Sequence, residues 1–345
     1  LQVRTKAFKE WFGDWEMANL IRLAKNAWDG NMPANKVVVS ASDKLKAKAL
    51  ELFGHEANSI VITDSSIRHI KNNHGKNESK RGQIDITPED IAVIPFVMNN
   101  FDTAEPKQDD RQGNKTIEFT KQINGVSYVI GVEKGKDKAF VVTNWIKKKS
   151  DASMPNTPMP NVQNGSDVAN VIKEVERIKK SYENSSKVVD ENGEPMVVCH
   201  GSGAEFNVFY SRGMTSRYAN FFTSDKSLAK KYAGDDGKVY EVFLSIKDID
   251  EYDANNDTYA GFYDKTNVIK NYMPYAEIVI RNIKDHPSGT NKRIKSSDVY
   301  IVGNEHSNQI KSATDNIGSF DSTNDDIKFR IIGETGASRM KNAEM

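Results

Sequence analysis

The sequence predicts an α+β chain with two domains. Between about residues 35 and 150, helical patterns come first and three alternating, strand-like runs follow. After a linker, short strand-like runs dominate again up to about residue 330. Helices and strands that are segregated along a chain, instead of strictly alternating, are typical of the α+β class. With 345 residues the chain is long enough for two or three domains with separate cores.

Residues 1–34 form the first predicted part. Aromatic residues recur there at the i, i+3, i+4, i+7 spacing of one helix face, at Phe8, Trp11, Phe12 and Trp15. We expect this face to pack against another part of the protein and not to bind a cofactor.

Residues 35–150 predict helices followed by an antiparallel sheet. Strand-like KVVVSAS and SIVIT alternate with helical DKLKAKALELFG and SSIRHIKNNHG. A further helix, TPEDIAVIPFVMNN, has Thr87 as its cap and Pro88 at its first position. Three alternating runs follow, with the turn signal Asn124-Gly125 between the first two and a Gly-Lys-Asp turn before the third. This order predicts an antiparallel meander.

The rest of the chain divides into three parts. Residues 151–165 are rich in Pro, Asn and Ser and predict a linker. Residues 166–330 begin with a helical stretch and continue in the short strand-like runs KVVD, PMVVCHG, KVYEVFLSI, AEIVIRNI and DVYIVG. Residues 331–345 show no period and are expected to be a frayed tail.

Composition limits the function classes. Hydrophobic residues make up 37% and charged residues 28% of the chain, which indicates a globular protein. The 48 basic and 48 acidic residues balance, so net charge does not mark a nucleic-acid binder. No apolar run approaches the roughly 20 residues that span a bilayer, and we expect no membrane association. Because the chain begins at Leu1, we expect it to be a segment of a longer polypeptide.

The single cysteine lies beside a histidine in the stretch Cys199-His200-Gly201-Ser202-Gly203. Alternation along a strand places Cys199 and His200 on opposite faces, where a thiolate–imidazole pair would lack hydrogen-bond reach. We therefore expect Cys199 to be a buried core residue. The glycines match neither of the two common phosphate-binding glycine motifs.

Four motifs occur in a fixed order over residues 185–328: VVDENGEP, HGS, FFTSD…A…YA and NQIKSATDNIGSFD. This order resembles the ADP-ribosyltransferase domains of phage polyvalent proteins, which are distant relatives of diphtheria toxin and the poly-ADP-ribose polymerases. The helix TKAFKEWFGDWE resembles the segment that usually precedes such domains, so residues 1–34 are expected to associate with the transferase domain. The resemblance implies a split-sheet fold, NAD as the cosubstrate, and loss of nicotinamide from NAD.

The resemblance also implies roles for single residues. His200 would bond a hydroxyl of the adenosine ribose, while the Gly201 backbone and the Ser202 hydroxyl would bind the nicotinamide amide. Phe221 stands where the family has its second-strand aromatic residue, and Tyr232 would stack on the nicotinamide ring.

A third polar group should hold the ribose 2′-hydroxyl and stabilise positive charge as the bond breaks. In the polymerase relatives this group is a glutamate that opens the strand matching VYIVG, and here Val299 stands in its place. We rank Asp298 first as the replacement, provided that a bulge or a register shift intervenes, then Gln309 and then Glu305. The departure favours mono-ADP-ribosyl transfer or NAD hydrolysis over polymer synthesis.

The stretch IVITDSSIRHIKNNHGKNESKRGQIDITPEDI, within residues 58–148, resembles the phage barnase/EndoU/colicin/RelE-like nucleases. Metal-independent RNA cleavage needs a general base, an acid and cations on the phosphate. The available imidazoles are His69, inside a helix, and His74, which we expect to be more exposed at the helix end. Thr143 is expected to line the same face, and Trp145 to stack a base.

Candidate phosphate-binding cations of this domain are Lys71, Lys80, Arg81, Lys121 and the run Lys147-Lys148-Lys149. No metal is expected, because His69 and His74 lie about 140° apart around a helix of 3.6 residues per turn.

The leading hypothesis combines a helix-then-antiparallel-sheet, nuclease-like domain with a split-sheet, ADP-ribosyltransferase-like domain. It is an NAD-dependent mono-ADP-ribosyltransferase, or NAD glycohydrolase, of phage or mobile-element origin. It would be delivered into, or expressed in, the cytoplasm of a bacterial host cell. Its expected partners are a host protein or nucleic acid that accepts ADP-ribose, RNA through the middle domain, and an immunity protein. Two alternatives stay open: an RNase toxin whose C-terminal domain only binds NAD, and degenerate binding modules without catalysis.

Overall fold

The computed structural model describes residues 2–31, 36–54, 56–107, 115–135, 139–149, 165–211, 218–266, 273–287, 295–314, 316 and 320–328. Most of the predicted linker and all of the predicted tail lie outside these residues. The chain forms two compact units. The split-sheet unit comprises Leu1–Trp15 and Glu183–Met345, and the helix-and-meander unit comprises Glu16–Tyr182.

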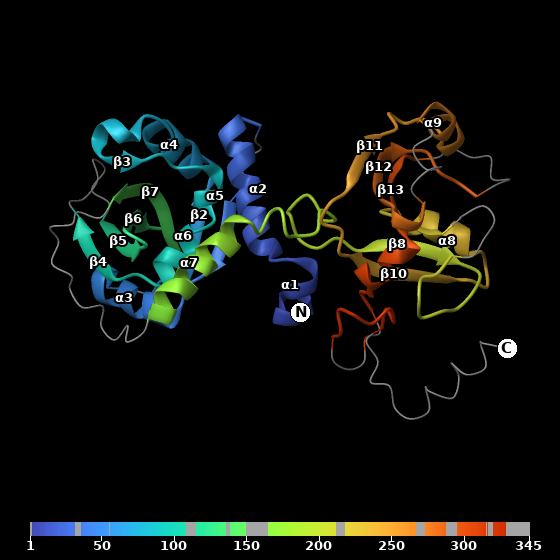
Figure 1. Ribbon diagram of the computed structural model, residues 1–345, viewed down its shortest axis with the longest axis horizontal. Helices are drawn as coiled ribbons and strands as arrows, with labels where there is room; N and C mark the ends of the chain where they lie inside the picture. The colour runs from blue at the N-terminus through green and yellow to red at the C-terminus, as the bar shows by residue number, and fades with distance from the viewer. Residues whose placement is uncertain are drawn as a thin grey trace, which may run out of the picture. The chain divides into compact units, whose positions relative to one another are not determined.

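The helix-and-meander unit contains seven strands in one sheet, in the order β1-β2-β7-β6-β5-β4, with β3 paired to β7. Figure 1 shows the meander strands with α3, α4 and α7 around them. The strands are β1 (Lys36–Ser40), β2 (Ser59–Thr63), β3 (Gln83–Ile84), β4 (Thr103–Lys107), β5 (Thr116–Ile123), β6 (Val126–Lys134) and β7 (Ala139–Lys149). The helices are α2 (Trp15–Asp29), α3 (Asp43–Phe53), α4 (Asp64–His74), η2 (Glu78–Arg81), α5 (Pro88–Ile91), α6 (Ile94–Asn99) and α7 (Gly165–Lys179).

The predicted meander is confirmed. Strands β5, β6 and β7 are consecutive antiparallel neighbours, while β2 and β7 pair in parallel. The β5–β6 turn has positive φ at both Asn124 (50°) and Gly125 (73°), the backbone that a two-residue hairpin turn of this kind requires. Helices followed by an antiparallel meander therefore describe most of this unit, while the parallel pairing of β2 with β7 makes the whole sheet mixed.

Two helices belong to a different unit from the one that the sequence predicted. Most of α2, predicted with the transferase domain, contributes Leu20, Ile21 and Ala24 to the core beneath the meander. Helix α7, also predicted with the transferase domain, contributes Val175 and Ile178 to the same core. The apolar stripe on each helix was evident in the sequence, but an apolar stripe does not say which sheet covers it.

The split-sheet unit contains a second seven-stranded sheet, in the order β11-β12-β13-β9-β8-β10-β14. Its strands are β8 (Val198–Ser202), β9 (Ala219–Thr223), β10 (Lys238–Leu244), β11 (Asp250–Asp253), β12 (Glu277–Ile283), β13 (Ser297–Gly303) and β14 (Ile310–Ser312). Its helices are η1 (Gln2–Arg4), α1 (Lys6–Phe12), α8 (Lys226–Ala233), α9 (Tyr259–Thr266), η3 (Met273–Tyr275) and η4 (Asn304–Gln309).

Helix α1 packs on the split sheet through its aromatic face. Phe8 is fully buried, and its ring meets that of Phe243 on β10 edge to face at 5.3 Å. The backbone joins the same contact, because Ser245 Oγ donates to the carbonyl of Trp11 at 2.7 Å. The aromatic spacing of the first helix thus serves packing, as the sequence indicated.

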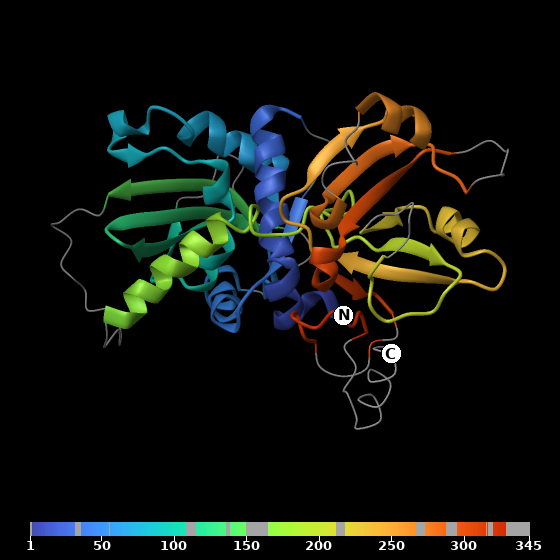
Figure 2. The same ribbon diagram turned by 45° about the vertical axis from the view of Figure 1, so that its right-hand side comes forward.

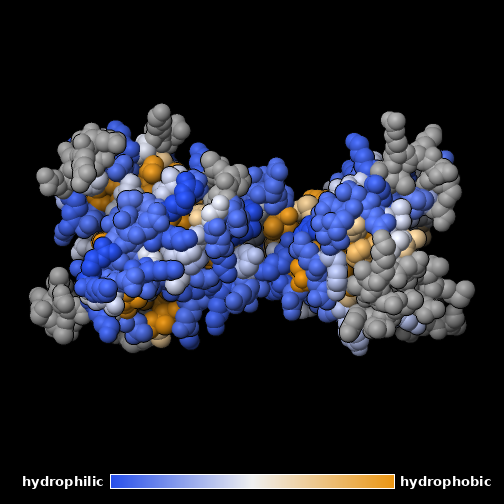
Figure 3. All heavy atoms as spheres, turned by 90° about the horizontal axis from the view of Figure 1, so that it is seen from above, coloured by the Kyte–Doolittle hydropathy of each residue, from blue (hydrophilic) through white to orange (hydrophobic). Residues whose placement is uncertain are grey.

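On the face seen in Figure 3, both units carry mostly hydrophilic residues, and the hydrophobic residues lie in small, separate groups. Among the described residues, the helices are too short or too polar to cross a bilayer.

Candidate functional site

The sheet of the split-sheet unit divides between β8 and β9. These two strands pair at Cys199↔Thr223, after which β9 continues along β13 and β8 along β10. Figure 2 shows the orange strands β12 and β13 parting from β8 and β10. The imidazole of His200 spans the division: its Nδ1 donates to the carbonyl of Phe221 on β9 at 2.7 Å. A side chain therefore replaces the ladder hydrogen bond that the parting strands do not form.

The His200 ring is held in a fixed orientation. It lies against the rings of Phe206, Phe209, Phe222 and Tyr240, at centroid distances of 6.0, 5.1, 5.6 and 6.4 Å. Burial lowers the pKa of His200 below its ordinary value, and the hydrogen bond to Phe221 offsets this only partly. The imidazole is therefore neutral at pH 7, with its proton on Nδ1 and an acceptor lone pair on Nε2.

Gly201 allows helix α8 to lie directly on β8. A Cβ at this position would lie 1.8 Å from the carbonyl oxygen of Ala229. The glycine is thus required by the approach of the helix, and the same helix carries Tyr232 one turn further on. Ser202 lies at the end of β8, where its Oγ accepts a hydrogen bond from the Ala204 amide at 3.1 Å.

A cavity of about 700 Å³ opens on the α8 side of the division. It is lined by 199–201 of β8, 221–223 of β9, residues of α8, the segments 258–260 and 284–287, and Val299. Four of the residues predicted from the sequence line it: His200, Gly201, Phe221 and Tyr232. The cavity also reveals Tyr259, whose ring contacts that of Phe221 at 6.4 Å, edge to face.

Cys199 is buried, 5% exposed, as the sequence predicted. Burial raises the pKa of its thiol above the ordinary value, with the negative charge of Glu241 as the next cause. A thiol of this kind is a poor nucleophile at neutral pH, although it forms part of the cavity wall.

Tyr232 and Asp285 form a hydrogen bond at the cavity, with the Tyr232 hydroxyl 2.8 Å from Asp285 Oδ1. Burial raises the pKa of Tyr232, and the charge of Asp285 raises it further. The hydroxyl therefore keeps its proton and donates, while Tyr232 as a whole residue remains 43% exposed.

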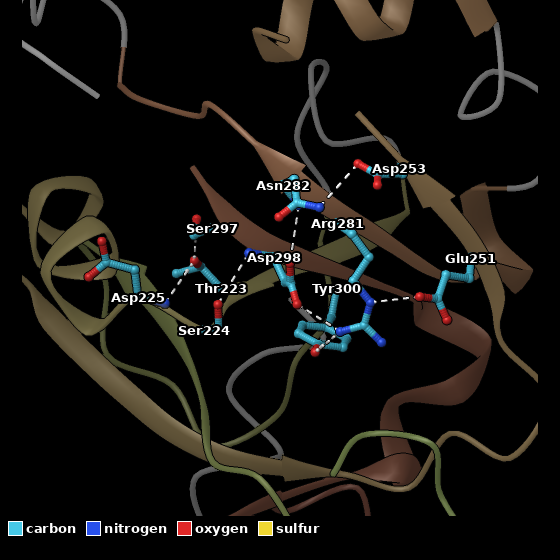
Figure 4. Close-up of polar contacts among 10 residues, drawn as sticks. All are labelled: Thr223, Ser224, Asp225, Glu251, Asp253, Arg281, Asn282, Ser297, Asp298 and Tyr300. Atoms are coloured by element: carbon cyan, nitrogen blue, oxygen red, sulfur yellow. Dashed lines mark hydrogen bonds and ion pairs between the residues drawn. The ribbon is translucent and has the colours of Figure 1, made fainter. Parts of the chain in front are cut away.

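The structure separates Asp298 from the cavity. Val299 lines the cavity, and Asp298 on the opposite face of β13 binds Arg281 Nη1 (2.7 Å) and the Asn282 amide (3.2 Å). Figure 4 shows this polar cluster, in which Arg281 also donates to the hydroxyl of Tyr300. Pairs Val299↔Thr223 and Tyr300↔Phe222 are in regular register, so β13 contains no bulge that would turn Asp298 round.

The two lower-ranked residues lie beyond the other end of β13, in η4. Gln309 Nε2 donates to Glu277 Oε1 at 2.6 Å, and Glu305 is exposed. Neither residue lines the cavity. The sequence offered only candidates in and after the strand that contains Val299, and Asp285, which follows β12, was not among them.

In the helix-and-meander unit the two histidines are placed in the opposite way from the prediction. His74 is 8% exposed, and its Nδ1 lies 3.2 Å from Oε2 of the fully buried Glu78. His69 is exposed and contacts Asn73, whose Nδ2 lies 3.2 Å from each ring nitrogen. His74 continues the buried face of α4 formed by Ile67 and Ile70, and this face reaches the last turn of the helix.

Several other residues proposed for RNA binding are engaged inside the protein. The expectation that Trp145 stacks a base was wrong, because its side chain is 0% exposed. Thr143 Oγ1 donates to the carbonyl of Gly131 at 3.2 Å. Lys121 pairs with Asp102 at 3.0 Å. Lys71 donates to the carbonyl of Trp28.

A buried ion cluster was not anticipated from the sequence. Asp90 is 0% exposed and pairs with Lys147 at 2.6 Å and with Lys179 at 2.5 Å. Burial alone would raise the pKa of Asp90, but the two lysines outweigh it and the net pKa is lowered. Lys147 therefore serves the fold, whereas Lys148 and Lys149 are exposed. Within the described ranges, His, Cys, Asp and Glu form no group of three or more that could hold a metal.

Comparison with known protein families confirms both resemblances. Residues 36–154 match the family model described as phage-Barnase-EndoU-ColicinE5/D-RelE like nuclease3. Residues 190–320 match the family model described as ADP-Ribosyltransferase in polyvalent proteins. No curated protein and no solved structure gives a significant match to the chain. At the family level, the two units are similar to a nuclease and to an ADP-ribosyltransferase.

Proposed function

We propose that the split-sheet unit binds NAD in the cavity beside His200 and transfers its ADP-ribose group to a host acceptor or to water. The observation that carries this proposal is His200: a neutral, oriented imidazole at the point where the sheet divides, next to a cavity of about 700 Å³. The family match over residues 190–320 supports the same activity.

The residues of the cavity fit a dinucleotide. Its volume lies within the roughly 300–1,000 Å³ of small-molecule sites. The rings of Phe221, Tyr259 and Tyr232 offer aromatic surfaces for the planar parts of the ligand. Among the described residues, His200 Nε2 has no hydrogen-bond partner, so it is available to accept from a ribose hydroxyl.

NAD supplies the ADP-ribose group, with nicotinamide as the leaving group. The protein contributes orientation: His200 fixes the ligand through one nitrogen because the other is bound to Phe221. Helix α8, held close to β8 by Gly201, places the ring of Tyr232 at the cavity. A ligand held by these contacts is confined before any bond breaks, and such confinement is worth several kcal/mol of barrier in general.

A second proposal concerns the helix-and-meander unit, which we infer cleaves RNA without a metal. Its support is an exposed surface cluster around Asn73, which contacts His69 through its side chain and accepts from Arg81 Nη2 through its carbonyl. In this cluster His69 supplies a general base. Arg81 supplies the phosphate-binding cation, because its side chain is 54% exposed and, among the described residues, only its Nη2 is engaged, by Asn73 and Glu78. The family match over residues 36–154 supports this activity.

Both activities suit a phage or mobile-element protein that acts on a host component in a bacterial cytoplasm. The acceptor of ADP-ribose would be a host protein or nucleic acid, and an immunity protein would protect the producing cell.

The transferase proposal is tested with NAD labelled in its adenylate part, incubated with the full chain and a bacterial lysate. We expect nicotinamide release, and radioactivity in a protein or nucleic-acid fraction if an acceptor is present. His200→Ala should lower nicotinamide release by about 100-fold, the scale of losing one preorganised polar group. His306→Ala is the matched control, because His306 lies outside the cavity, and it should change release by less than about twofold. Equal release by the wild type and His200→Ala would contradict the proposal.

A further inference from the structure

Strand β12 contains a bulge opposite Asp298. Ile280 pairs with Val299, and the next pair joins Ile283 to Ser297, so three steps along β12 correspond to two along β13. Asn282 adopts a positive φ of 53° within this irregularity. Bulges of this kind re-aim the side chains that follow them and are frequent beside active sites.

The bulge changes which face the later residues of β12 occupy. In a regular strand Ile280 and Ile283 would face opposite sides, yet both are buried in the same apolar cluster as Val299. Continuing the alternation from Ile283 brings Asp285 to that face, and Asp285 does line the cavity. Without the extra residue, the carboxylate would point to the opposite side of the sheet.

Three contacts hold Asp285 in place. Its Oδ1 accepts from the Tyr232 hydroxyl at 2.8 Å. The backbone of the preceding residue is fixed at both ends: the Lys284 amide donates to the carbonyl of Asp257 (2.9 Å), and the Lys284 carbonyl accepts from the Tyr259 amide (3.2 Å). Among the described residues, Asp285 Oδ2 accepts no hydrogen bond, which leaves it for a ligand.

We propose that Asp285 supplies the carboxylate that β13 lacks at Val299. Resting on the proposed function, this assigns Oδ2 of Asp285 as the acceptor for a hydroxyl of the nicotinamide-side ribose and as the negative charge that stabilises this ribose during cleavage. The bond between ribose C1′ and the nicotinamide nitrogen breaks, and its electron pair leaves with nicotinamide. An oxygen or nitrogen atom of the acceptor, or the oxygen atom of water, forms the new bond to C1′ and releases its proton to solvent. Tyr232 is a positioning residue for Asp285, in addition to its contact with the cavity.

The decisive experiment compares Asp285→Asn with Asp298→Asn in the full chain. Each change removes one negative charge at nearly constant volume, but only Asp285 lines the cavity. We expect Asp285→Asn to bind NAD within about threefold of the wild type while kcat for nicotinamide release falls by about 100-fold. Asp298→Asn should retain release within about threefold. Circular dichroism and melting curves of both variants establish that they are folded.

Two further variants test the geometry. Tyr232→Phe keeps the ring and removes the hydrogen bond, so we expect kcat to fall by about 10-fold with KM for NAD unchanged within about twofold. Asp285→Glu should recover at least about 10-fold of the activity lost in Asp285→Asn, since a merely structural hydrogen bond acceptor would not require a charge.

The outcomes separate the two proposals. Wild-type chain that neither binds nor cleaves NAD overturns the proposed function and the role of Asp285 together. If the wild type cleaves NAD and Asp285→Asn is equally active, the role of Asp285 is wrong and the proposed function stands. A loss of activity in Asp298→Asn alone would show that Asp298 on β13, and not Asp285, supplies the carboxylate.

Discussion

The two units differ in what their polar side chains are bound to. In the split-sheet unit, His200, Tyr232 and Asp285 line a cavity, and each is held in position by a hydrogen bond from one of its polar atoms. In the helix-and-meander unit, His74 and Lys147 are buried against the carboxylates of Glu78 and Asp90. Similar residue types thus face a ligand-sized space in one unit and the interior in the other.

Polar residues near a predicted site are therefore of two physical kinds. A buried ion pair is expensive to desolvate, and it is retained only where its partners satisfy it closely, so its members are not available to a substrate. A polar side chain beside a cavity that makes only part of its possible hydrogen bonds is already oriented by the folded protein. It still offers a donor or acceptor atom to a ligand. The comparison predicts that damage to the first kind changes stability and damage to the second changes chemistry.

The largest expected effect on stability is that of Asp90→Asn. The change leaves Lys147 and Lys179 near a neutral, buried amide, and loss of one partner in a buried ionic cluster costs about 3–5 kcal/mol. Hydrogen exchange followed peptide by peptide should show faster exchange in the meander strands and α7, with nicotinamide release unchanged. Asp43→Asn is the matched control, because Asp43 forms an exposed pair with Lys46 and should cost less than about 1 kcal/mol. Equal effects of both variants would refute the structural role of the cluster.

The pH dependence of the Asp90 contribution has a definite sign. Its folded-state pKa is lowered, so the unfolded chain takes up a proton before the folded protein does as the pH falls. The stabilisation is therefore present above the ordinary aspartate pKa and is lost as the pH falls through the lower, folded value. Asp90→Asn should abolish this part of the acid sensitivity of the meander.

Next in size is Gly201→Ala, expected to destabilise the split-sheet unit by about 3 kcal/mol. The new methyl group would lie 1.8 Å from the backbone oxygen of Ala229. The clash can be relieved only if α8 moves away from β8. Because α8 carries Tyr232, NAD binding should weaken as well. Gly203→Ala provides the control: a Cβ there meets nothing within 4 Å, so both melting temperature and NAD binding should be preserved. Calorimetric titration with NAD and thermal melting measure the two effects.

Much of the fold could be predicted from the sequence because local patterns specify it. The i, i+3, i+4 spacing of Phe8, Trp11 and Phe12 gave α1, although Trp15 at i+7 begins α2 after a break at Gly13. Asn124-Gly125 gave the hairpin between β5 and β6. Burial of Cys199 followed from strand alternation. These features depend on neighbours close in the chain, where periodicity is informative.

The missed carboxylate shows why the rest could not be predicted in the same way. Asp285 reaches the cavity because one extra residue in β12 reverses the alternation, and its partner Tyr232 lies 53 residues earlier. A signal did exist: in the run AEIVIRNIKD the isoleucines at 280 and 283 are three residues apart, which breaks the period of two. For His74 a local signal also existed, because it lies four residues after Ile70 on the buried face of α4.

The two histidines of α4 should differ in their effect on RNA cleavage. If the helix-and-meander unit is a nuclease, His69→Ala should lower cleavage by about 100-fold, because a general base contributes about 10²–10⁴-fold and His69 is the exposed imidazole. His74→Ala should affect cleavage mainly through stability, since His74 is bound to buried Glu78. Cleavage of a structured RNA, with 2′,3′-cyclic ends as the product signature, measures the difference at a temperature where both variants are folded. A selective loss in His74→Ala would reverse the assignment.

The smallest expected effect is the pH dependence that His200 gives to the split-sheet unit. Its folded-state pKa lies below the ordinary value of 6.5, so folded and unfolded chains are both neutral at this residue well above pH 6.5. As the pH falls below 6.5, the unfolded chain takes up a proton that the folded imidazole resists, and stability is lost at no more than about 1.4 kcal/mol per pH unit. Melting of wild type and His200→Gln between pH 7.5 and about 5.5 isolates this contribution, because the other titrating groups are common to both. We expect the wild type to lose more stability than the variant over this range. A smaller loss in the wild type would mean that His200 is protonated in the folded protein, and its role as an acceptor for a ribose hydroxyl would then fail.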